Sequence, residues 1–210
     1  MKVGSFGKVE KGKDHKVCED AIFLDKKIKL FAVADGVTVP AGGKEAAERS
    51  VKYLKKFWKG DLIEAIKRTN EKIIDDRAKK FIGYTTLTAA KIDDGMVRIA
   101  TIGDSPCYLV YSGRMIPMGS FDRIFGTHAL AQSIGEENVN IHYSEEKIGS
   151  GNYILLMTDG ITDVLSKEEI LNVFVKEKKV DEIAKKILKL ADKKSTIYND
   201  DKSIIIIQIL

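Results

Sequence analysis

The sequence predicts an α+β fold, in which two antiparallel sheets pack face to face with helices outside both. Three observations predict this four-layer α-β-β-α sandwich. Short apolar runs of strand length recur along the chain, and several follow one another with only tight turns between them. Pairs of segments with helical periodicity stand before and after that block. The 210 residues, 44% of them hydrophobic, suit one domain or two very small ones, and we expect one domain over residues 1–210.

Strands are expected first. Residues 1–11 alternate weakly between apolar and polar side chains, which favours an edge strand. The apolar runs at 21–24 and 28–34 are separated by a polar turn at 25–27. These runs therefore predict a β-hairpin.

Two helices are expected next. Apolar residues recur at helical spacing from about Lys44, and Gly60 interrupts that pattern. Asp61, directly after the glycine, is a good helix N-cap. A second helix is therefore predicted from there to about Lys79.

The rest of the chain alternates β and α segments. A meander of short strands is predicted at residues 85–92, 96–102, 107–111 and 114–118. Residues 128–134 are expected to form one or two helical turns, and 139–148 a strand. The last elements are predicted as a strand at 153–157, helices at 167–175 and 180–191, and a strand at 203–210.

Carboxylates stand at the ends of five of these strand-like runs: Glu19-Asp20, Asp35, Asp104, Asp159 and Asp200-Asp201. One such aspartate is most simply a turn residue or a helix cap. Five groups at strand ends instead indicate one shared acidic pocket. Carboxylates held together repel one another unless cations lie between them, and their oxygens suit Mg²⁺ or Mn²⁺.

Ordered motifs carry a family resemblance along nearly the whole chain. They are Glu19-Asp20, V-A-D-G at 33–36, G-Y-T-T-L-T-A at 83–89, I-G-D-S at 102–105, A-L-A-Q-S-I-G at 129–135, M-T-D-G-I-T-D at 157–163 and D-D-K-S at 200–203. With these motifs the chain resembles the metal-dependent serine/threonine protein phosphatases of the 2C type (PPM), in their compact bacterial and archaeal form. The resemblance implies two Mn²⁺ or Mg²⁺ ions in the core of the site, with room for a third.

The resemblance also implies roles for the core acidic residues. Asp35 would bridge two ions, with the Gly36 carbonyl as a further ligand. Asp159 and Asp200 would each hold an ion directly. Asp35, Asp159 and Asp200 are thus the expected catalytic carboxylates.

The outer acidic residues are assigned in the same way. Asp20 would bind mostly through water, and Glu19 likewise if it faces inward. Because neighbours on a strand point to opposite faces, the two residues cannot both be ideal ligands. Asp104 and Asp163, together with Asp159, match the positions of the weaker third metal site.

The implied reaction is hydrolysis of phosphoserine and phosphothreonine in a protein that a serine/threonine kinase has phosphorylated. Two ions sharing a water lower its pKa toward neutral, and the bridging hydroxide attacks phosphorus in line. No nucleophilic serine or cysteine is needed. Cys18 and Cys107 are expected to be reduced thiols without a catalytic role.

Several positions depart from the family pattern. His15 stands where members often have a phosphate-gripping arginine, and Val37 where many have a histidine proposed as general acid. We expect His15 to take one of these two roles, with a plain loop histidine as the alternative. The usual arginine after G-D-S is Pro106 here. Arg114 and Arg123 are candidates for phosphate contact, with ordinary surface charge as the alternative.

A further departure concerns the flap subdomain beside the active site, which is predicted to be short or absent at about residues 113–128.

The sequence is also compatible with three alternative functions. The chain could be a pseudophosphatase that binds a phosphoprotein, a hydrolase of small phosphate esters, or a metal-binding structural module.

Composition argues against a nucleic-acid-binding, secreted or membrane protein. The net charge of +4 is modest, with lysines spread over predicted helix faces, so no nucleic-acid partner is expected. The N-terminus has no apolar signal segment, and no apolar stretch has the ~18 residues that a bilayer crossing needs. A monomer in the cytoplasm, without membrane contact, is expected.

Overall fold

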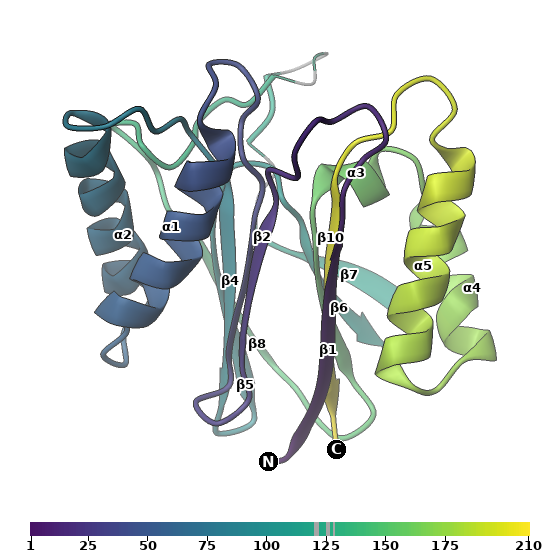
Figure 1. Cartoon of the computed structure of the whole chain (residues 1–210). Helices are drawn as coiled ribbons and strands as arrows, with labels where there is room; N and C mark the ends of the chain where they lie inside the picture. The colour runs from purple at the N-terminus through teal and green to yellow at the C-terminus, as the bar shows by residue number, and fades with distance from the viewer. Residues whose placement is uncertain (120–121, 125–126, 128) are drawn as a thin grey trace.

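Two five-stranded antiparallel sheets pack face to face in the computed structural model, which describes residues 1–119, 122–124, 127 and 129–210 (Figure 1). The first sheet has the order β1 (Val3–Glu10), β10 (Lys202–Ile209), β9 (Tyr153–Met157), β6 (Cys107–Tyr111) and β7 (Arg114–Met118). The second has the order β2 (Ala21–Asp25), β3 (Leu30–Ala34), β4 (Leu87–Asp93), β5 (Met96–Ile102) and β8 (His142–Lys147). The predicted edge strand and hairpin are confirmed. The predicted meander is wrong as a single unit, because its four strands form two hairpins, β4–β5 and β6–β7, that lie in different sheets.

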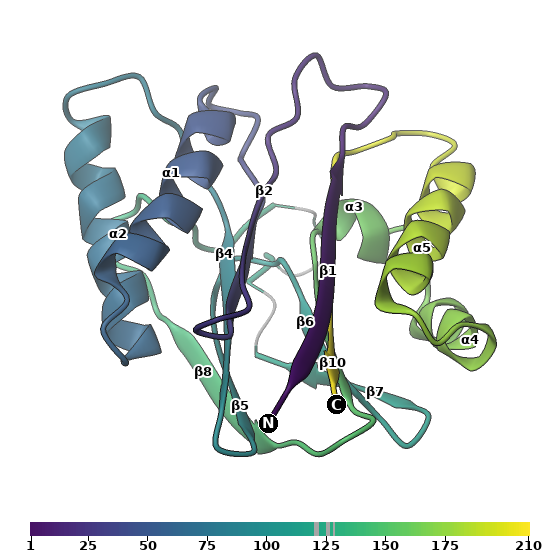
Figure 2. The same cartoon turned by 60° about the horizontal axis from the view of Figure 1, so that its bottom comes forward.

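Helices cover the outer face of each sheet, which confirms the four-layer arrangement (Figures 1 and 2). The second sheet carries α1 (Gly43–Phe57) and α2 (Leu62–Arg77). The first carries α3 (Asp159–Thr162), α4 (Lys167–Lys176) and α5 (Val180–Lys194). The predicted N-cap is also confirmed, since the Asp61 carboxylate accepts a hydrogen bond of 2.9 Å from the Glu64 amide.

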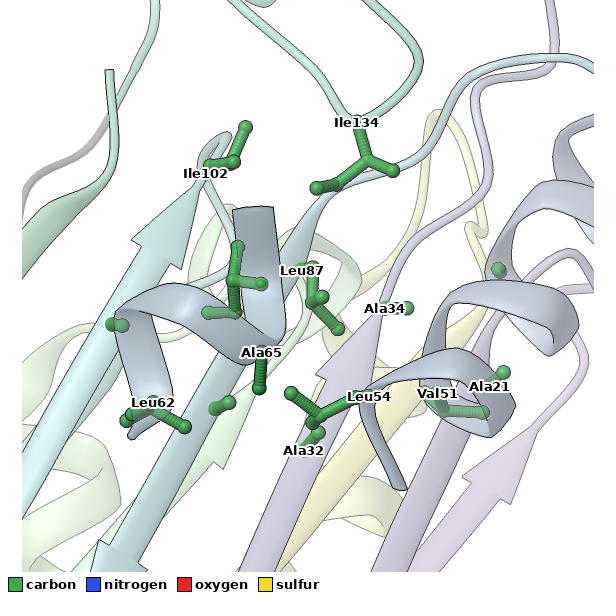
Figure 3. Close-up of a cluster of buried hydrophobic side chains, with 14 of the residues drawn as sticks. Ala21, Ala32, Ala34, Val51, Leu54, Leu62, Ala65, Leu87, Ile102 and Ile134 are labelled. Carbon is green, nitrogen blue, oxygen red and sulfur yellow. The ribbon is translucent and has the colours of Figure 1, made fainter. Parts of the chain in front are cut away.

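Three apolar clusters hold the four layers together. One lies between the two sheets, one under α4 and α5, and one under α1 and α2. Figure 3 shows part of the last cluster, to which Val51 and Leu54 of α1, Ala65 of α2 and Leu87 of β4 contribute. Burial of this apolar area is the main favourable term in folding.

The isoleucine run at 204–207 reflects the place of β10 in this arrangement. Ile204 and Ile206 pack toward the helices, while Ile205 and Ile207 pack between the sheets. A strand buried on both faces needs apolar residues at every position, so the alternation typical of half-exposed strands is absent.

The helical turns predicted for residues 128–134 are wrong for the part of that segment that is described. His128 lies outside the described residues. Leu130 pairs with Arg123, and Ile134 pairs with Thr85, in extended bridges. The Ile134 amide donates to the Thr85 carbonyl over 2.8 Å. Pairing with the end of the second sheet satisfies this backbone, and it prevails over local helical periodicity.

The structure also describes part of the predicted flap region and both cysteines. Part of the predicted flap region, residues 114–118, forms β7, whereas 120–121, 125–126 and 128 lie outside the described residues. Both cysteines are free thiols, with Cys107 buried and Cys18 half-buried.

Among the described residues, none of the helices combines the length and the apolar character that a bilayer crossing needs.

One buried carboxylate joins the two helices on the second sheet. Asp76 of α2 accepts hydrogen bonds from Arg49 and Tyr53 of α1 and from Lys72 of its own helix. Burial alone would raise the pKa of Asp76, but the bonds and charges of Lys72, Tyr53 and Arg49 outweigh it and lower the pKa to about 2. The folded state therefore favours the ionised form.

We expect Asp76→Asn to lower the free energy of unfolding by about 1–3 kcal/mol at neutral pH, because it removes these charge-assisted bonds. The stabilisation by Asp76 is complete above the ordinary aspartate pKa and is lost as the pH falls through the folded value near 2. Urea titrations at neutral pH and near pH 2.5 measure the difference. Asp75→Asn, on the exposed face of the same helix, is the control and should change stability by less than about 0.5 kcal/mol. An equal loss for both variants would contradict the prediction.

Candidate metal centre

Strand register brings acidic residues to one end of the second sheet. Ala34 of β3 pairs with Ala21 of β2, so Asp35 leaves one strand where Asp20 enters the other. The end of β5 lies at the same edge, since Ile102 pairs with Leu87 at the start of β4. Asp104 follows that end. Antiparallel pairing thus collects residues that are far apart in sequence.

The first sheet contributes acidic residues in the same way. Met157 at the end of β9 pairs with Ile204 near the start of β10. Asp159 therefore follows one strand at the edge where Asp200 precedes the other. In Figure 1 the N-terminal ends of β2 and β10 and the short helix α3 lie at the top of the sandwich, away from both chain termini.

A cavity of about 470 Å³ opens at this end of the molecule. Six predicted site residues line it: His15, Asp35, Gly36, Asp104, Asp159 and Asp200. Val37, which stands where a histidine is common in the family that the sequence resembles, also lines the cavity. The structure thus brings carboxylates from both sheets to one solvent-accessible space.

The two Asp-Gly motifs need their glycines because backbone passes very close to them. A Cβ on Gly36 would lie 2.4 Å from the carbonyl carbon of Gly43, at the start of α1. A Cβ on Gly160 would lie 2.0 Å from the carbonyl oxygen of Asp201. No side chain fits at such distances, so these glycines allow both aspartates to approach the cavity.

Threonines of the 83–89 motif fix the main chain of Asp35. The Asp35 amide donates to Thr86 Oγ1 over 2.9 Å, and Thr85 Oγ1 donates to the Asp35 carbonyl over 2.7 Å. Thr86 Oγ1 also shares a hydrogen bond with Ser105 Oγ. These contacts fix the backbone from which the Asp35 carboxylate extends.

The grouped carboxylates are electrostatically costly without a cation. Burial, with the nearby charges of Asp20 and Asp159, raises the pKa of Asp35 well above its ordinary value. Burial also raises the pKa of Asp20 to about 8, and the pKa of Asp159 to about 7 with the help of Asp104 and Asp200. Strongly raised carboxylate pKa values in a cavity indicate a functional site.

The two carboxylate oxygens of Asp20 indicate whether the site is suited to a metal ion. Its Oδ2 accepts a hydrogen bond of 2.9 Å from Thr158 Oγ1. Its Oδ1 is buried and has no hydrogen-bond partner among the described residues. A buried carboxylate oxygen without a partner is unfavourable in a protein interior but is a good acceptor for a hydrated cation. The carboxylate set therefore fits hard divalent ions.

Glu19 does not line the cavity. Its carboxylate accepts a hydrogen bond of 2.7 Å from Thr38 Oγ1 on the exposed side of the loop. Its carbonyl accepts the Gly36 amide over 3.2 Å. Of the Glu19-Asp20 pair, Asp20 is the buried member, in line with the alternation of neighbouring side chains.

Asp201 is buried, and the sequence places it among the strand-end carboxylates without a role of its own. Its Oδ1 accepts the Gly12 amide, and its Oδ2 accepts the Glu19 amide, both over 2.7 Å. Its Oδ2 also lies 2.8 Å from Nδ1 of His15. Asp201 thus anchors the loop before β2 to the start of β10. The consecutive aspartates of D-D-K-S are the sequence signal that could have indicated it.

The contact with Asp201 fixes the orientation of His15. With Nδ1 held, Nε2 contacts the Tyr198 hydroxyl and lies 3.2 Å from Asp200 Oδ1. Burial lowers the pKa of His15, but the hydrogen bond and charge of Asp201, with the charge of Asp200, outweigh burial and raise it. The ligand atoms of His15, Asp200 and Asp201 lie within 4.8 Å of one another, a separation that could also suit an ion.

Asp104, Asp159 and Asp163 also lie together, as their assignment to one site requires. A single side chain, Arg123, forms ion pairs with all three of them. From the sequence, Arg123 is a candidate for phosphate contact, with ordinary surface charge as the alternative. Nothing local in the sequence indicates these pairs.

The chain is similar to known protein phosphatases in sequence. The family model described as Stage II sporulation protein E (SpoIIE) matches residues 44–210. A putative protein phosphatase 2C-type from Streptococcus pyogenes is 26% identical over 206 residues, covering 83% of this chain and 84% of that protein.

Solved structures agree on the fold. PppA, a regulatory component of the type VI secretion system in Pseudomonas aeruginosa, superposes with a TM-score of 0.89 at 16% identity, over 100% of this chain and 99% of that one. The catalytic domain of the phosphatase PstP, in complex with two manganese ions, superposes with a TM-score of 0.86 at 22% identity, over 98% and 97%. The chain belongs to the PPM family of 2C-type serine/threonine protein phosphatases, within the group that the SpoIIE model describes.

Proposed function

We propose that this protein hydrolyses phosphoserine and phosphothreonine in phosphoproteins, with Mn²⁺ or Mg²⁺ bound by the acidic cavity. The observation that carries the proposal is the convergence of Asp35, Asp159 and Asp200 from both sheets on one open cavity. Nearby, Asp20 Oδ1 is buried and has no hydrogen-bond partner in the part of the chain that the structure describes. Such a cluster has a high electrostatic cost in the folded state, and binding of divalent cations offsets it.

We assign the residues of the cavity to holding metal ions or to positioning other residues. Asp35, Asp159 and Asp200, with the Gly36 carbonyl, would hold two ions, and Asp20 would hold their hydration shell. Such ions supply, when bound, an activated water and stabilisation of phosphoryl charge. Thr85 and Thr86 keep Asp35 in place, and the open cavity leaves the phosphate ester accessible from solvent.

Relatives support the choice of metal and substrate class. The PstP domain holds two manganese ions. The Streptococcus pyogenes relative is described as a 2C-type protein phosphatase. A partner phosphorylated by a serine/threonine kinase, a cytoplasmic location and a monomeric state remain predictions for this chain.

A pseudophosphatase is the second candidate, and two residues favour it. Val37 lines the cavity where a histidine is common in the family, and Pro106 replaces a common arginine. The retained carboxylates argue against it, because an inactive site gains nothing from keeping a cluster that destabilises the fold.

Hydrolysis of a phosphothreonine peptide, compared with p-nitrophenyl phosphate, tests the proposal. We expect turnover of the peptide with Mn²⁺ or Mg²⁺ and its loss with EDTA or in Asp159→Asn. Metal binding without any turnover would favour the pseudophosphatase. A higher kcat/KM for the small ester would favour a small-ester hydrolase.

His15 is proposed as the group that either protonates the leaving oxygen or contacts the phosphate. Asp201 holds its Nδ1, so Nε2 faces the side of the cavity where Asp200 lies. We expect His15→Ala to lower kcat by about 10²-fold, as general acids commonly contribute. Asp201→Asn should lower it less and change the pH profile, because it acts only by positioning the ring. Unchanged kcat, KM and pH profile in His15→Ala would leave it a plain loop histidine.

A further inference from the structure

Arg123 contacts three predicted metal ligands at once. Its Nε pairs with Asp104 Oδ2, its Nη1 lies 2.8 Å from Asp163 Oδ1, and its Nη2 lies 3.0 Å from Asp159 Oδ2. Every nitrogen of the guanidinium therefore faces a different carboxylate. Planar N–H groups in a fixed fork match carboxylate oxygens closely, so this contact is stronger than a single surface ion pair.

The three carboxylates come from two places in the fold. Asp104 follows β5 and is buried, whereas Asp159 and Asp163 lie one turn apart at α3. The amide of Asp163 donates to the carbonyl of Asp159 over 2.8 Å, which sets their spacing. Three negative charges in a partly buried space need a positive charge among them. Arg123 supplies it permanently, because arginine does not lose its proton in proteins.

The neighbouring residue Asp122 holds Arg123 over this cluster. Its Oδ2 accepts the Gly103 amide over 3.0 Å, and its Oδ1 lies 2.7 Å from Nε2 of His142. Its carbonyl accepts the Ala131 amide over 2.6 Å. The connection between β7 and β8 is thus tied directly to the Gly103-Asp104 turn, so the guanidinium position is built into the fold.

We propose that Arg123 is a built-in cation that occupies the third metal position of this site and limits it to two metal ions. The inference rests on the proposed metal-dependent function and deepens it. A third ion would need oxygens of the same carboxylates that now accept from the guanidinium. Asp163 then serves to hold Arg123 and is not a metal ligand in the unmodified protein.

Metal stoichiometry tests this directly. We expect isothermal titration calorimetry with Mn²⁺, on protein first freed of metal with EDTA, to give two ions per chain. Arg123→Ala should bind three, and Arg123→Ala combined with Asp163→Asn should return to two. Arg114→Ala is the matched control. Arg114 is exposed and pairs with Tyr111 at the hairpin end of β7, opposite the end of β6 that follows Asp104, so its removal should leave two ions.

Asp163→Asn alone provides a second measurement that does not depend on how Arg123→Ala folds. We expect it to bind two ions, as the unmodified chain does. Three ions in the unmodified chain, falling to two in Asp163→Asn, would overturn the inference. So would two ions in an Arg123→Ala variant whose circular dichroism matches the parent. If the unmodified chain bound no Mn²⁺ at all, the proposed metal-dependent function itself would fail, which is a distinct outcome.

Discussion

Asp35→Asn should abolish turnover and, at the same time, raise the melting temperature of the metal-free protein. Asparagine keeps the size of the side chain but removes the charge with which Asp35 would help to hold the metal ions. We expect kcat to fall by at least about 10³-fold, the scale on which loss of transition-state charge stabilisation acts. Phosphopeptide hydrolysis at saturating Mn²⁺ measures this loss.

The gain in stability has a separate cause. Burial disfavours the charge of Asp35, and the nearby charges of Asp20, Asp159, Asp200 and Asp104 add to this effect. Neutralising Asp35 relieves repulsion that a bound cation or protonation would otherwise relieve. A gain of about 1 kcal/mol corresponds to about 2–4 °C in Tm for a chain of this size. Differential scanning calorimetry in EDTA measures it.

Asp181→Asn is the control for both readouts, because it removes a half-buried carboxylate of α5 that pairs with Lys185 and does not line the acidic cavity. It should leave kcat within about twofold of the parent and Tm within about 2 °C. A folded Asp35→Asn variant that retains parental kcat would contradict the catalytic assignment. A lower metal-free Tm in that variant would contradict the electrostatic one.

The stability of the metal-free protein should rise as the pH falls from about 9 to about 6. Folding raises the pKa of Asp20 to about 8 and that of Asp159 to about 7, far above the ordinary value of 3.8. The folded state therefore takes up protons that the unfolded state has not yet bound. The penalty for holding these carboxylates together is full above the folded pKa values, and protonation relieves it as the pH falls through them.

Thermal melts in EDTA between about pH 9 and about pH 6 should show a Tm increase of about 5 °C or more toward the acidic end. Excess Mn²⁺ should raise Tm most at the alkaline end and flatten the trend, because binding to the folded state adds stability by mass action. The raised pKa of His15 also makes the folded state more stable as the pH falls, so the same melts should be measured on His15→Gln to separate its contribution. A metal-free Tm that stays level or falls toward pH 6 would contradict the prediction.

Local pattern sufficed for much of this fold. Apolar runs of strand length marked β9 and β10, and Asp61 marked the start of α2 because an N-cap acts on the amides of its own first turn. The acidic residues at strand ends could be collected into one site from sequence, since antiparallel pairing places alternate strand ends at the same edge. The family motifs then supplied roles for Asp35, Asp159 and Asp200.

Other features depended on where distant segments meet. Residues 129–134 had a helical pattern, yet pairing of Ile134 with Thr85 decided their conformation. His15 gains its orientation from Asp201, 186 positions away, and Arg123 reaches Asp163, 40 positions away. Periodicity and capping act over a few residues and can be read along the chain. Ion pairs between loops depend on how the packed sheets bring those loops together. Only the tertiary structure therefore decided that Arg123 is the cation that faces Asp104, Asp159 and Asp163.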